Sequence, residues 1–398
     1  MRWRTCALAL LAPAWLSGCA RHATSTAEHA ITLRPVAFAA LPGWVSDHQA
    51  QAMPALLAGC AVFAAAPDRA LGGSGDAAAQ GGKAAQWLSS CAAAAAVPSG
   101  DDTAARAFFE AQFQPYAVAD TAGSGLFTGY YEPEVNGSRT PGEGYATPLL
   151  GRPDDLVQVD LGAFSPDLAG KHVTGRLQGG QLVPYYDRAA IVDGALAERR
   201  LDLLWLADPV DAFVLQIQGS GRVRLRDGST VRVSYAAQNG RPYVPLGRVL
   251  ADRGDIPLKQ VSMQSIRAWL AAHPDQAAAA MDQNPSYVFF RELDDLHPDQ
   301  GPPGALGAAL TPGRSIAVDK RFIPLGAPVF VDTTDPLDHR PLDRLMLAQD
   351  LGGAIRGPVR ADIFWGRDRD AEARAGVMNA KGGATLLLPR AGQVAAAR

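Results

Sequence analysis

Two aspartates near the C-terminal end of the chain, Asp350 and Asp362, lie twelve positions apart. A Gly-Gly turn and a Gly-Pro corner separate them, and Asp362 stands between the apolar residues Ala361 and Ile363. A carboxylate among apolar neighbours loses hydration, which favours its neutral form and raises its pKa. A raised pKa is what a general acid needs near neutral pH. The alternative is that both aspartates only close turns, since Asp is a common turn residue.

The segment around Asp362 has the alternating pattern of a β-strand. Alternate residues from Val359 to Trp365 are apolar and would share one face. Asp362 would share the other face with Arg360 and Phe364. Because a cation beside the carboxylate would lower its pKa, we expect Arg360 to turn aside, toward a substrate or toward Asp350.

The N-terminus has the features of an export signal. An apolar run, Ala7–Trp15, follows two arginines and precedes Leu16-Ser17-Gly18-Cys19. The run is too short to span a bilayer as a helix. This pattern is typical of a bacterial lipoprotein in which Cys19 becomes the acylated N-terminus, with an ordinary cleaved signal or an incidental cysteine as alternatives. Ala20 stands where an inner-membrane retention signal would have Asp, which favours the outer membrane.

Composition narrows the functional classes. The net charge is −3 and no basic stripe is present, which argues against a nucleic-acid partner. The seven histidines are scattered and no zinc-binding motif occurs, so no metal site is expected. Cys60 and Cys91 form an even pair for an oxidising compartment, which predicts a disulfide, with two buried free thiols as the alternative.

Secondary-structure signals change along the chain. Alanine-rich helices are expected up to Phe113, most clearly at 103–113, and short strands after Gly125. Further expected elements are strands at 126–131, 213–218, 223–225 and 231–233, a hairpin turn at 226–229, helices at 262–272 and 275–281, and strands from Gly304 onwards.

Five motifs occur in order between about Phe127 and Pro389. They are Thr128-Gly129-Tyr130-Tyr131-Glu132-Pro133, Gln216-Ile217-Gln218-Gly219-Ser220-Gly221, Tyr243-Val244-Pro245-Leu246-Gly247, Asn284-Pro285-Ser286-Tyr287-Val288-Phe289-Phe290, and the run from Ser315 to Gly366. Together they resemble the membrane-bound lytic murein transglycosylase A family, which has a three-aspartate double-psi β-barrel domain. One such motif would be weak, whereas five in this order are specific.

The resemblance implies a mainly β fold with helical elaborations. A double-psi β-barrel domain would carry an inserted second β-rich domain, with a groove between them. The expected parts are a lipoprotein signal peptide at 1–18, a tether at 19–40, a helical region with the barrel catalytic domain at 41–138 plus 238–398, and the inserted domain at 139–237.

Roles for individual residues also come from the resemblance. Asp362 matches the single catalytic acid, Asp350 would support the site, and Asp319 matches the third aspartate, with a turn or cap role as the alternative. Polar and aromatic residues of the motifs would bind substrate: Thr128, Tyr130, Gln216, Gln218, Ser220, Tyr287 and Phe364.

Strand periodicity places several of these side chains. Thr128 and Tyr130 would share a face beside the acid. Gln216 and Gln218 would share a face of the strand at 213–218, and the alternative is that they are solvated strand positions. Phe364 would provide desolvation and a platform for a sugar ring.

The resemblance implies cleavage of the MurNAc–GlcNAc bond of peptidoglycan glycan strands without water and without a metal or organic cofactor. The muramic acid C6 hydroxyl would attack its own anomeric carbon and leave a 1,6-anhydromuramyl end. The partners would be glycan strands and the outer membrane, while any wall-synthesis partner is unidentified. The alternatives are a hydrolase in which Asp350 or Glu132 activates water, and a wall-binding lipoprotein without activity.

Overall fold

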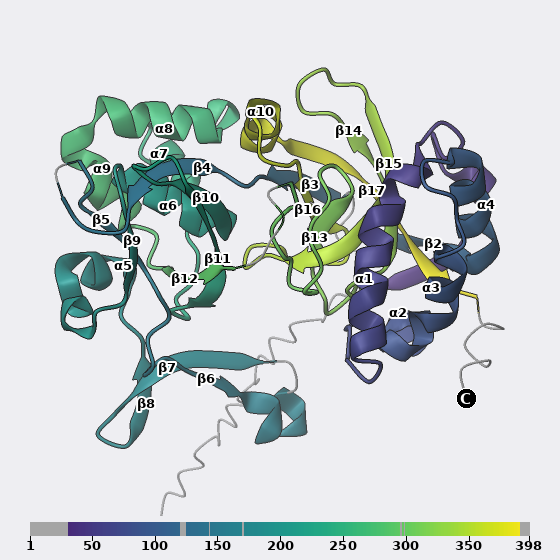
Figure 1. The fold of residues 1–398 in the computed structure, drawn as a ribbon, viewed down its shortest axis with the longest axis horizontal. Coiled ribbons are helices and arrows are strands. Elements are labelled where there is room, and N and C mark those ends of the chain that lie inside the picture. Colours follow the sequence, from purple (N-terminus) through teal and green to yellow (C-terminus); the bar gives the residue numbers. More distant parts are fainter. Residues whose placement is uncertain are drawn as a thin grey trace, which may run out of the picture.

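Two β-rich units, each with its own helices, lie side by side in the computed structural model (Figure 1). The structure describes residues 31–119, 125–142, 144–168, 171–294, 297 and 299–390. The predicted signal peptide and Cys19 therefore lie outside the described residues. Within the described ranges, every helix is too short or too polar to cross a bilayer.

The first unit is built on a closed six-stranded barrel. Its strands, in ring order, are β3 (Gly125–Tyr130), β16 (Arg360–Phe364), β13 (Ser315–Val318), β15 (Pro341–Leu351), β14 (Pro328–Thr334) and β17 (Asn379–Pro389). The ring closes because β17 pairs with both β14 and β3. The expectation that the 126–131 segment and the C-terminal third share one barrel is confirmed.

Helices of the N-terminal region cover one side of this barrel (Figure 1). They are α1 (Met53–Ala65), α2 (Gly75–Gly81), α3 (Leu88–Ala94) and α4 (Asp102–Gln112). Asp101 caps α4 by accepting a hydrogen bond from the backbone N–H of Ala104 at 2.9 Å, as expected for a helix starting there. The predicted disulfide between Cys60 and Cys91 is confirmed, with Cα atoms 5.5 Å apart. It joins α1 to α3 and stabilises this region by roughly 3–4 kcal/mol in the chain-entropy picture.

The expected tether at 19–40 is wrong at its C-terminal end. β1 (Thr32–Pro35) pairs antiparallel with β2 (Phe113–Ala119), and β2 pairs with β17 of the barrel. The backbone of β1 satisfies its hydrogen bonds on the free edge of β2, so this segment belongs to the barrel sheet.

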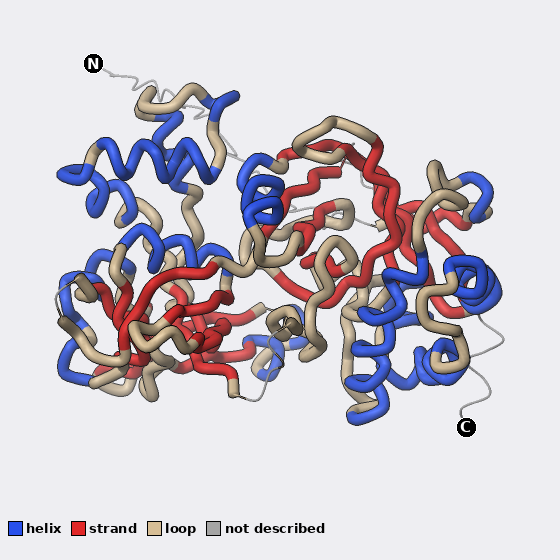
Figure 2. The backbone as a smooth tube through the Cα atoms, turned by 45° about the horizontal axis from the view of Figure 1, so that its top comes forward, coloured by secondary structure: helices blue, strands red, loops and turns tan. Residues whose placement is uncertain are grey.

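The second unit is built on a six-stranded sheet and carries a separate three-stranded sheet (Figures 1 and 2). The large sheet has the order β12 (Val288–Leu293), β11 (Thr230–Gln238), β10 (Ser220–Arg224), β4 (Glu134–Ser138), β9 (Asp202–Leu206) and β5 (Thr147–Leu150). The small sheet comprises β6 (Val157–Asp160), β7 (His172–Gln178) and β8 (Gln181–Pro184). Helices α6 (Pro209–Gln218), α7 (Leu246–Asp252), α8 (Met263–Ala272) and α9 (Pro274–Met281) complete the unit.

The expected bounds of the inserted domain, 139–237, are too narrow. β4 begins at Glu134 and lies in the large sheet, and β11 continues past residue 237. After three α-helices the chain returns to this sheet as β12, which pairs with β11, so the second unit extends as far as Leu293. The expected helices at 262–272 and 275–281 are confirmed and lie inside the same unit.

The strand expected at 213–218 is wrong, because these residues form the C-terminal part of α6. The signals at its ends are helical: the side chain of Asp208 accepts a hydrogen bond from the backbone N–H of Val210 at 2.8 Å, and Pro209 follows it. Gly219 ends the helix with a φ of 78°. Gln216 and Gln218 consequently point in different directions, about 200° apart around the helix.

The hairpin expected at 226–229 is confirmed. It connects β10 to β11, and Val223 pairs with Val231 across it. Asp227 accepts hydrogen bonds from the N–H and the hydroxyl of Ser229 at 2.9 and 2.6 Å, which stabilises the turn.

Candidate active site

Asp350 and Asp362 lie on two strands that flank the same residue of β13. Ala317 pairs with Asp350 of β15 on one side and with Asp362 of β16 on the other. On the far side of β16, Thr128 of β3 pairs with Asp362. Residues paired across neighbouring strands point to the same face of a sheet, so the two carboxyl groups and the Thr128 hydroxyl share one face.

The Asp362 carboxyl group is held by one hydroxyl. Thr128 Oγ1 donates to Asp362 Oδ1 at 2.6 Å, and Nη2 of Arg360 donates to Thr128 Oγ1 at 2.9 Å. Since the arginine occupies a lone pair of the hydroxyl, the hydroxyl proton is directed to Asp362 Oδ1. A proton on this carboxyl group therefore resides on Oδ2, the oxygen that Thr128 does not contact.

Burial raises the pKa of Asp362, as expected. The Thr128 hydrogen bond and the Arg360 cation oppose this rise, and the charge of Asp350 adds to it. The expectation that Arg360 turns aside is also confirmed, since its Nη1 donates to the carbonyl oxygens of Leu126 and Ala361 at 3.3 and 2.6 Å. These backbone contacts, rather than Asp350, orient the guanidinium.

The Asp350 carboxyl group accepts hydrogen bonds from a tyrosine hydroxyl and from a backbone N–H. The Tyr130 hydroxyl donates to its Oδ2 at 2.8 Å and the backbone N–H of Ala305 donates to its Oδ1 at 2.9 Å. Burial raises the pKa of Asp350, and these donors together with the backbone of Leu351 oppose the rise. The charge of Asp350 adds to the rise at Asp362, so the two carboxyl groups titrate as a coupled pair. Burial and both aspartates raise the pKa of Tyr130, so its phenol is a neutral donor at neutral pH.

Glu132 is fully enclosed by two arginines of the second unit. Its carboxylate accepts hydrogen bonds from Arg222 Nε at 3.0 Å and from Arg232 Nη2 at 2.8 Å. Only 1% of the Glu132 side chain is exposed, so it has no access to a water molecule that it could activate. The alternative in which Glu132 is the base of a hydrolase is therefore contradicted. Among the residues that the structure describes, no three His, Cys, Asp or Glu side chains are grouped to hold a metal ion.

Two family models match this chain. The model described as the MltA specific insert domain matches residues 126–291, and the model described as the 3D domain matches residues 314–388. A curated relative from Escherichia coli strain K12, the membrane-bound lytic murein transglycosylase A, is 32% identical over 287 residues, which are 69% of each chain. The corresponding protein of Vibrio cholerae is 28% identical over 286 residues, 69% of this chain and 68% of its own.

This chain belongs to the membrane-bound lytic murein transglycosylase A family.

Solved structures agree with this family membership. The membrane-bound lytic murein transglycosylase from Agrobacterium tumefaciens has a TM-score of 0.78 and 34% identity, and the match covers 90% of this chain and 98% of that one. MltA from Neisseria gonorrhoeae, in its monoclinic form, has a TM-score of 0.74 and 36% identity over 91% and 93% of the two chains. Escherichia coli MltA with bound chitohexaose has a TM-score of 0.58 and 29% identity over 73% and 79%. The expected mainly β fold with a double-psi β-barrel is thereby confirmed, and the insert match ending at 291 agrees with β12 lying in the second unit.

Several motif residues of this transglycosylase A family chain are buried away from solvent. The exposed fractions are 7% for Gln216, 6% for Ser220, 4% for Tyr287 and 1% for Phe364. Their burial contradicts the prediction that these side chains contact substrate. Gln218 instead accepts a hydrogen bond from the backbone N–H of Tyr131 at 3.0 Å, which ties α6 to the strand leaving the barrel.

Of the two roles predicted for Phe364, the structure supports desolvation of the site but not a platform for a sugar ring. Phe364 packs against Tyr130 with ring centroids 5.3 Å apart, in a small apolar cluster that also contains Ala317. It therefore desolvates the active-site face from beneath, whereas a platform for a sugar ring would have to be exposed. The burial of Tyr287 raises its pKa to about 12 and places it in the core of the second unit.

Asp319 has the turn role. Its carboxylate pairs with Arg321 at 2.6 Å and accepts a hydrogen bond from the backbone N–H of Gly357 at 2.9 Å. Burial tends to raise its pKa, but these hydrogen bonds and the Arg321 cation lower it overall. Asp319 thus holds the loop that leads into β16, rather than facing Asp362 directly.

Two contributions to the site could not be read from residue types alone. The backbone N–H of Ala305 has no sequence signal. Tyr243 belongs to one of the five motifs and was not assigned a role there. Burial raises the pKa of Tyr243, with the Arg188 cation opposing and the Asp362 carboxylate adding to the rise, so this tyrosine of the second unit lies near the acid.

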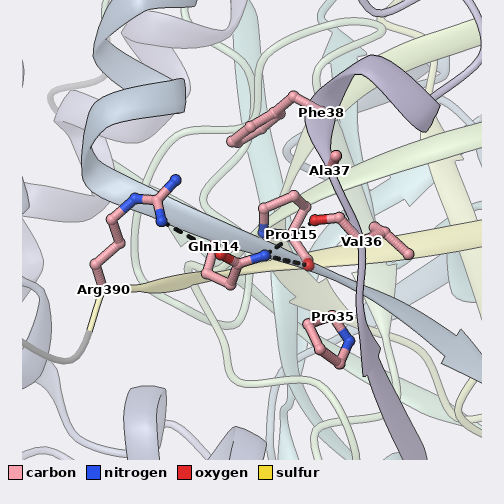
Figure 3. Close-up of a pocket in the computed structure, with 7 residues that line it drawn as sticks. All are labelled: Pro35, Val36, Ala37, Phe38, Gln114, Pro115 and Arg390. Atoms are coloured by element: carbon pink, nitrogen blue, oxygen red, sulfur yellow. Dashed lines mark hydrogen bonds between the residues drawn. The ribbon is translucent and has the colours of Figure 1, made fainter.

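The one hollow that Figure 3 draws is separate from the aspartates. Its lining residues come from the β1–β2 edge and the end of β17: Pro35, Val36, Ala37, Phe38, Gln114, Pro115 and Arg390. None of the predicted site residues lines it.

The environment of Asp362 predicts how activity depends on pH. The family resemblance assigns Asp362 as the acid, and an acid must carry its proton, so under this assignment activity should fall as pH rises through its raised pKa. Replacing Arg360 by glutamine removes a cation that lowers this pKa, so the alkaline limb of the pH–rate profile should move to higher pH. Rates of glycan release from sacculi measured across pH test this. The exposed Arg356→Gln variant is the control, and an unmoved alkaline limb in Arg360→Gln contradicts the assignment.

Proposed function

We propose that this chain is a lytic transglycosylase that cleaves the MurNAc–GlcNAc β-1,4 bond of peptidoglycan glycan strands without water. The observation that carries the proposal is the pair of carboxyl groups, Asp350 and Asp362, which lie on one face of the barrel and whose pKa values are both raised by burial. In the proposed reaction Asp362 holds the proton and Asp350 carries the charge, which is the division of roles that acid catalysis at a glycosidic bond requires.

Asp362 serves first as the acid. Its Oδ2 donates a proton to the departing glycosidic oxygen while Thr128 holds Oδ1. Positive charge develops on the anomeric carbon of the muramic acid, and the ionised Asp350 stabilises it electrostatically. The Tyr130 hydroxyl and the Ala305 N–H keep Asp350 in place for this role.

Asp362 then serves as the base. Its carboxylate accepts the proton of the muramic acid C6 hydroxyl, whose oxygen forms the new bond to the anomeric carbon. The products are a 1,6-anhydromuramyl end and a free GlcNAc 4-hydroxyl, and the carboxyl group is protonated again. An internal nucleophile of this kind has a large effective concentration, which lowers the barrier by several kcal/mol. One acid is enough because neither water nor an enzyme nucleophile is needed.

The glycan is proposed to lie between the barrel face and the second unit. Tyr243 of that unit is close enough to Asp362 for the Asp362 charge to raise its pKa, and Escherichia coli MltA binds chitohexaose in a solved structure. Digestion of purified sacculi followed by mass spectrometry tests the reaction. Anhydro products, one water lighter than hydrolysed ones, are expected; hydrolysed ends would instead indicate that Asp350 activates water. Absence of any soluble product would favour a wall-binding protein.

We also propose that Cys19 is acylated and anchors the protein to the periplasmic side of the outer membrane. The support is the lipoprotein pattern of the first nineteen residues and the membrane-bound description of the relatives. Fractionation of cells that express Cys19→Ala tests it, because the variant should leave the membrane fraction. Retention of the variant in the membrane fraction would contradict a lipid anchor at Cys19.

A further inference from the structure

A cluster of three charged side chains lies where the chain passes from one unit to the other. β3 of the barrel ends at Tyr130 and β4 of the second unit begins at Glu134, so Glu132 is in the connection. The exposed fractions of the side chains are 1% for Glu132, 8% for Arg222 and 7% for Arg232. Buried charges of this kind add little stability compared with apolar residues of the same volume, whereas their hydrogen bonds can fix the geometry of the groups that they join.

The cluster is connected to Asp362 through the backbone of Glu132. The Glu132 N–H donates to the carbonyl oxygen of Gly366 at 2.7 Å, and the Trp365 N–H donates to the carbonyl oxygen of Tyr130 at 2.9 Å. These two bonds extend the β3–β16 pairing beyond the strand ends. The same pairing places Thr128 opposite Asp362, so the position of Glu132 bears directly on the 2.6 Å bond between them.

The cluster is connected to Asp350 through the loop before β13. Arg222 Nη2 donates to the carbonyl oxygen of Gln300 at 3.3 Å, and this loop continues to Ala305, whose N–H donates to Asp350. The loop packs closely on itself and on β15. A Cβ at Gly301 would lie 2.1 Å from the carbonyl oxygen of Leu310, and one at Gly304 would lie 2.5 Å from that of Gln349. A shift of the loop at Gln300 therefore displaces the donor to Asp350.

We propose that Glu132, clamped by Arg222 and Arg232, is a positioning residue that sets the placement of both active-site aspartates relative to the second unit. The inference rests on the proposed function for its catalytic consequence. Its structural content is independent of the reaction. The Glu132 carboxylate binds two arginines of the second unit's sheet, its backbone N–H extends the pairing with the strand that carries Asp362, and Arg222 reaches the loop that holds Asp350.

Glu132→Gln tests the proposal because the amide keeps the shape of the side chain and removes its charge. We expect kcat on soluble glycan strands to fall about 10- to 100-fold, since small misplacements of catalytic groups have effects of this size. KM should change less than kcat, because Glu132 is buried and does not face the glycan. The pH–rate profile should move to higher pH, since the Thr128 and Ala305 hydrogen bonds that lower the pKa values of Asp362 and Asp350 are weakened.

The chain provides a matched control close to the cluster. Glu134, two residues after Glu132, forms an ion pair with Arg224, two residues after Arg222 in β10, with 42% and 58% of their side chains exposed. Glu134→Gln should leave kcat and the pH profile as in the parent. The groups around the two aspartates, namely Arg360, Tyr130 and Tyr243, are the same in every variant.

A readout independent of catalysis separates this inference from the proposed function. Carbon-13 NMR titration of the Asp350 and Asp362 carboxyl groups should show both pKa values higher in Glu132→Gln than in the parent. If Glu132→Gln does not fold, Arg222→Lys is used, which keeps the cation and loses the fork that contacts Glu132 and Gln300. A parent without lytic activity but with the shifted titration overturns only the function. A folded variant with parental kcat and parental titration overturns the positioning role.

Discussion

Asp362→Asn protein is expected to lose lytic activity on the order of 10²–10⁴-fold, which is the usual contribution of a positioned proton donor. The asparagine keeps an oxygen for the Thr128 hydroxyl, so the local structure and the affinity for glycan should remain close to those of the parent. Asp350, the neighbouring carboxyl group, is held by Tyr130 and by the Ala305 N–H and is therefore not placed to replace it. Release of soluble fragments from sacculi measures the loss, and calorimetric titration with chitohexaose measures binding.

The other two aspartates provide graded controls for this variant. Asp350→Asn should have an intermediate effect, because it removes a charge near the anomeric carbon while leaving the acid in place. Asp319→Asn should be milder for catalysis, since Asp319 binds Arg321 and the Gly357 N–H. A nearly inactive Asp350→Asn beside a nearly parental Asp362→Asn would reverse the two roles.

Asp47→Ala is expected to lower the free energy of unfolding of the barrel unit by about 3–5 kcal/mol, because removal of one partner leaves a buried charge unpaired. Asp47 and Arg314 form a two-contact ion pair at 2.9 and 3.0 Å, each with 3% of its side chain exposed. Asp47 also accepts a hydrogen bond from the backbone N–H of Leu345 at 2.8 Å. The pair joins the N-terminal region to β13 and β15, the strands around the active site. Urea denaturation followed by circular dichroism measures the change.

An exposed ion pair of the second unit is the control for Asp47→Ala. Arg248 and Asp252 lie one helical turn apart on α7 and are both more than half exposed. Asp252→Ala should therefore change stability far less than Asp47→Ala does. Equal effects of the two variants would mean that the Asp47–Arg314 pair contributes no more than a surface pair.

Local sequence signals were sufficient for features that depend on near neighbours. The alternation from Val359 to Trp365 predicted β16 with its apolar face in the core, where Ala361 and Ile363 are found. The Asp-Gly turn at 226–229 predicted the β10–β11 hairpin. These predictions held because backbone periodicity and turn chemistry act within a few residues.

The same local signals failed where contacts with distant parts of the chain determine secondary structure or burial. Alternation over six residues suggested a strand at 213–218, while the capping residues at Asp208 and Gly219 favoured the helix that forms. The motif residues Gln216, Tyr287 and Phe364 have types suited to a sugar-binding surface. They are buried because helices and strands from distant parts of the chain pack over them, and nothing in their own segments indicates this.

The roles of the two aspartates show the same division between sequence and structure. Residue type, spacing and family resemblance were enough to single out Asp350 and Asp362 as the candidate catalytic pair. The size of the pKa shift of each carboxyl group depends on groups far away in the chain: Thr128 on Asp362, and Tyr130 with the Ala305 N–H on Asp350. Desolvation and hydrogen bonding depend on every atom within a few ångströms, whatever its position in the sequence, so these pKa shifts arise only when the barrel closes.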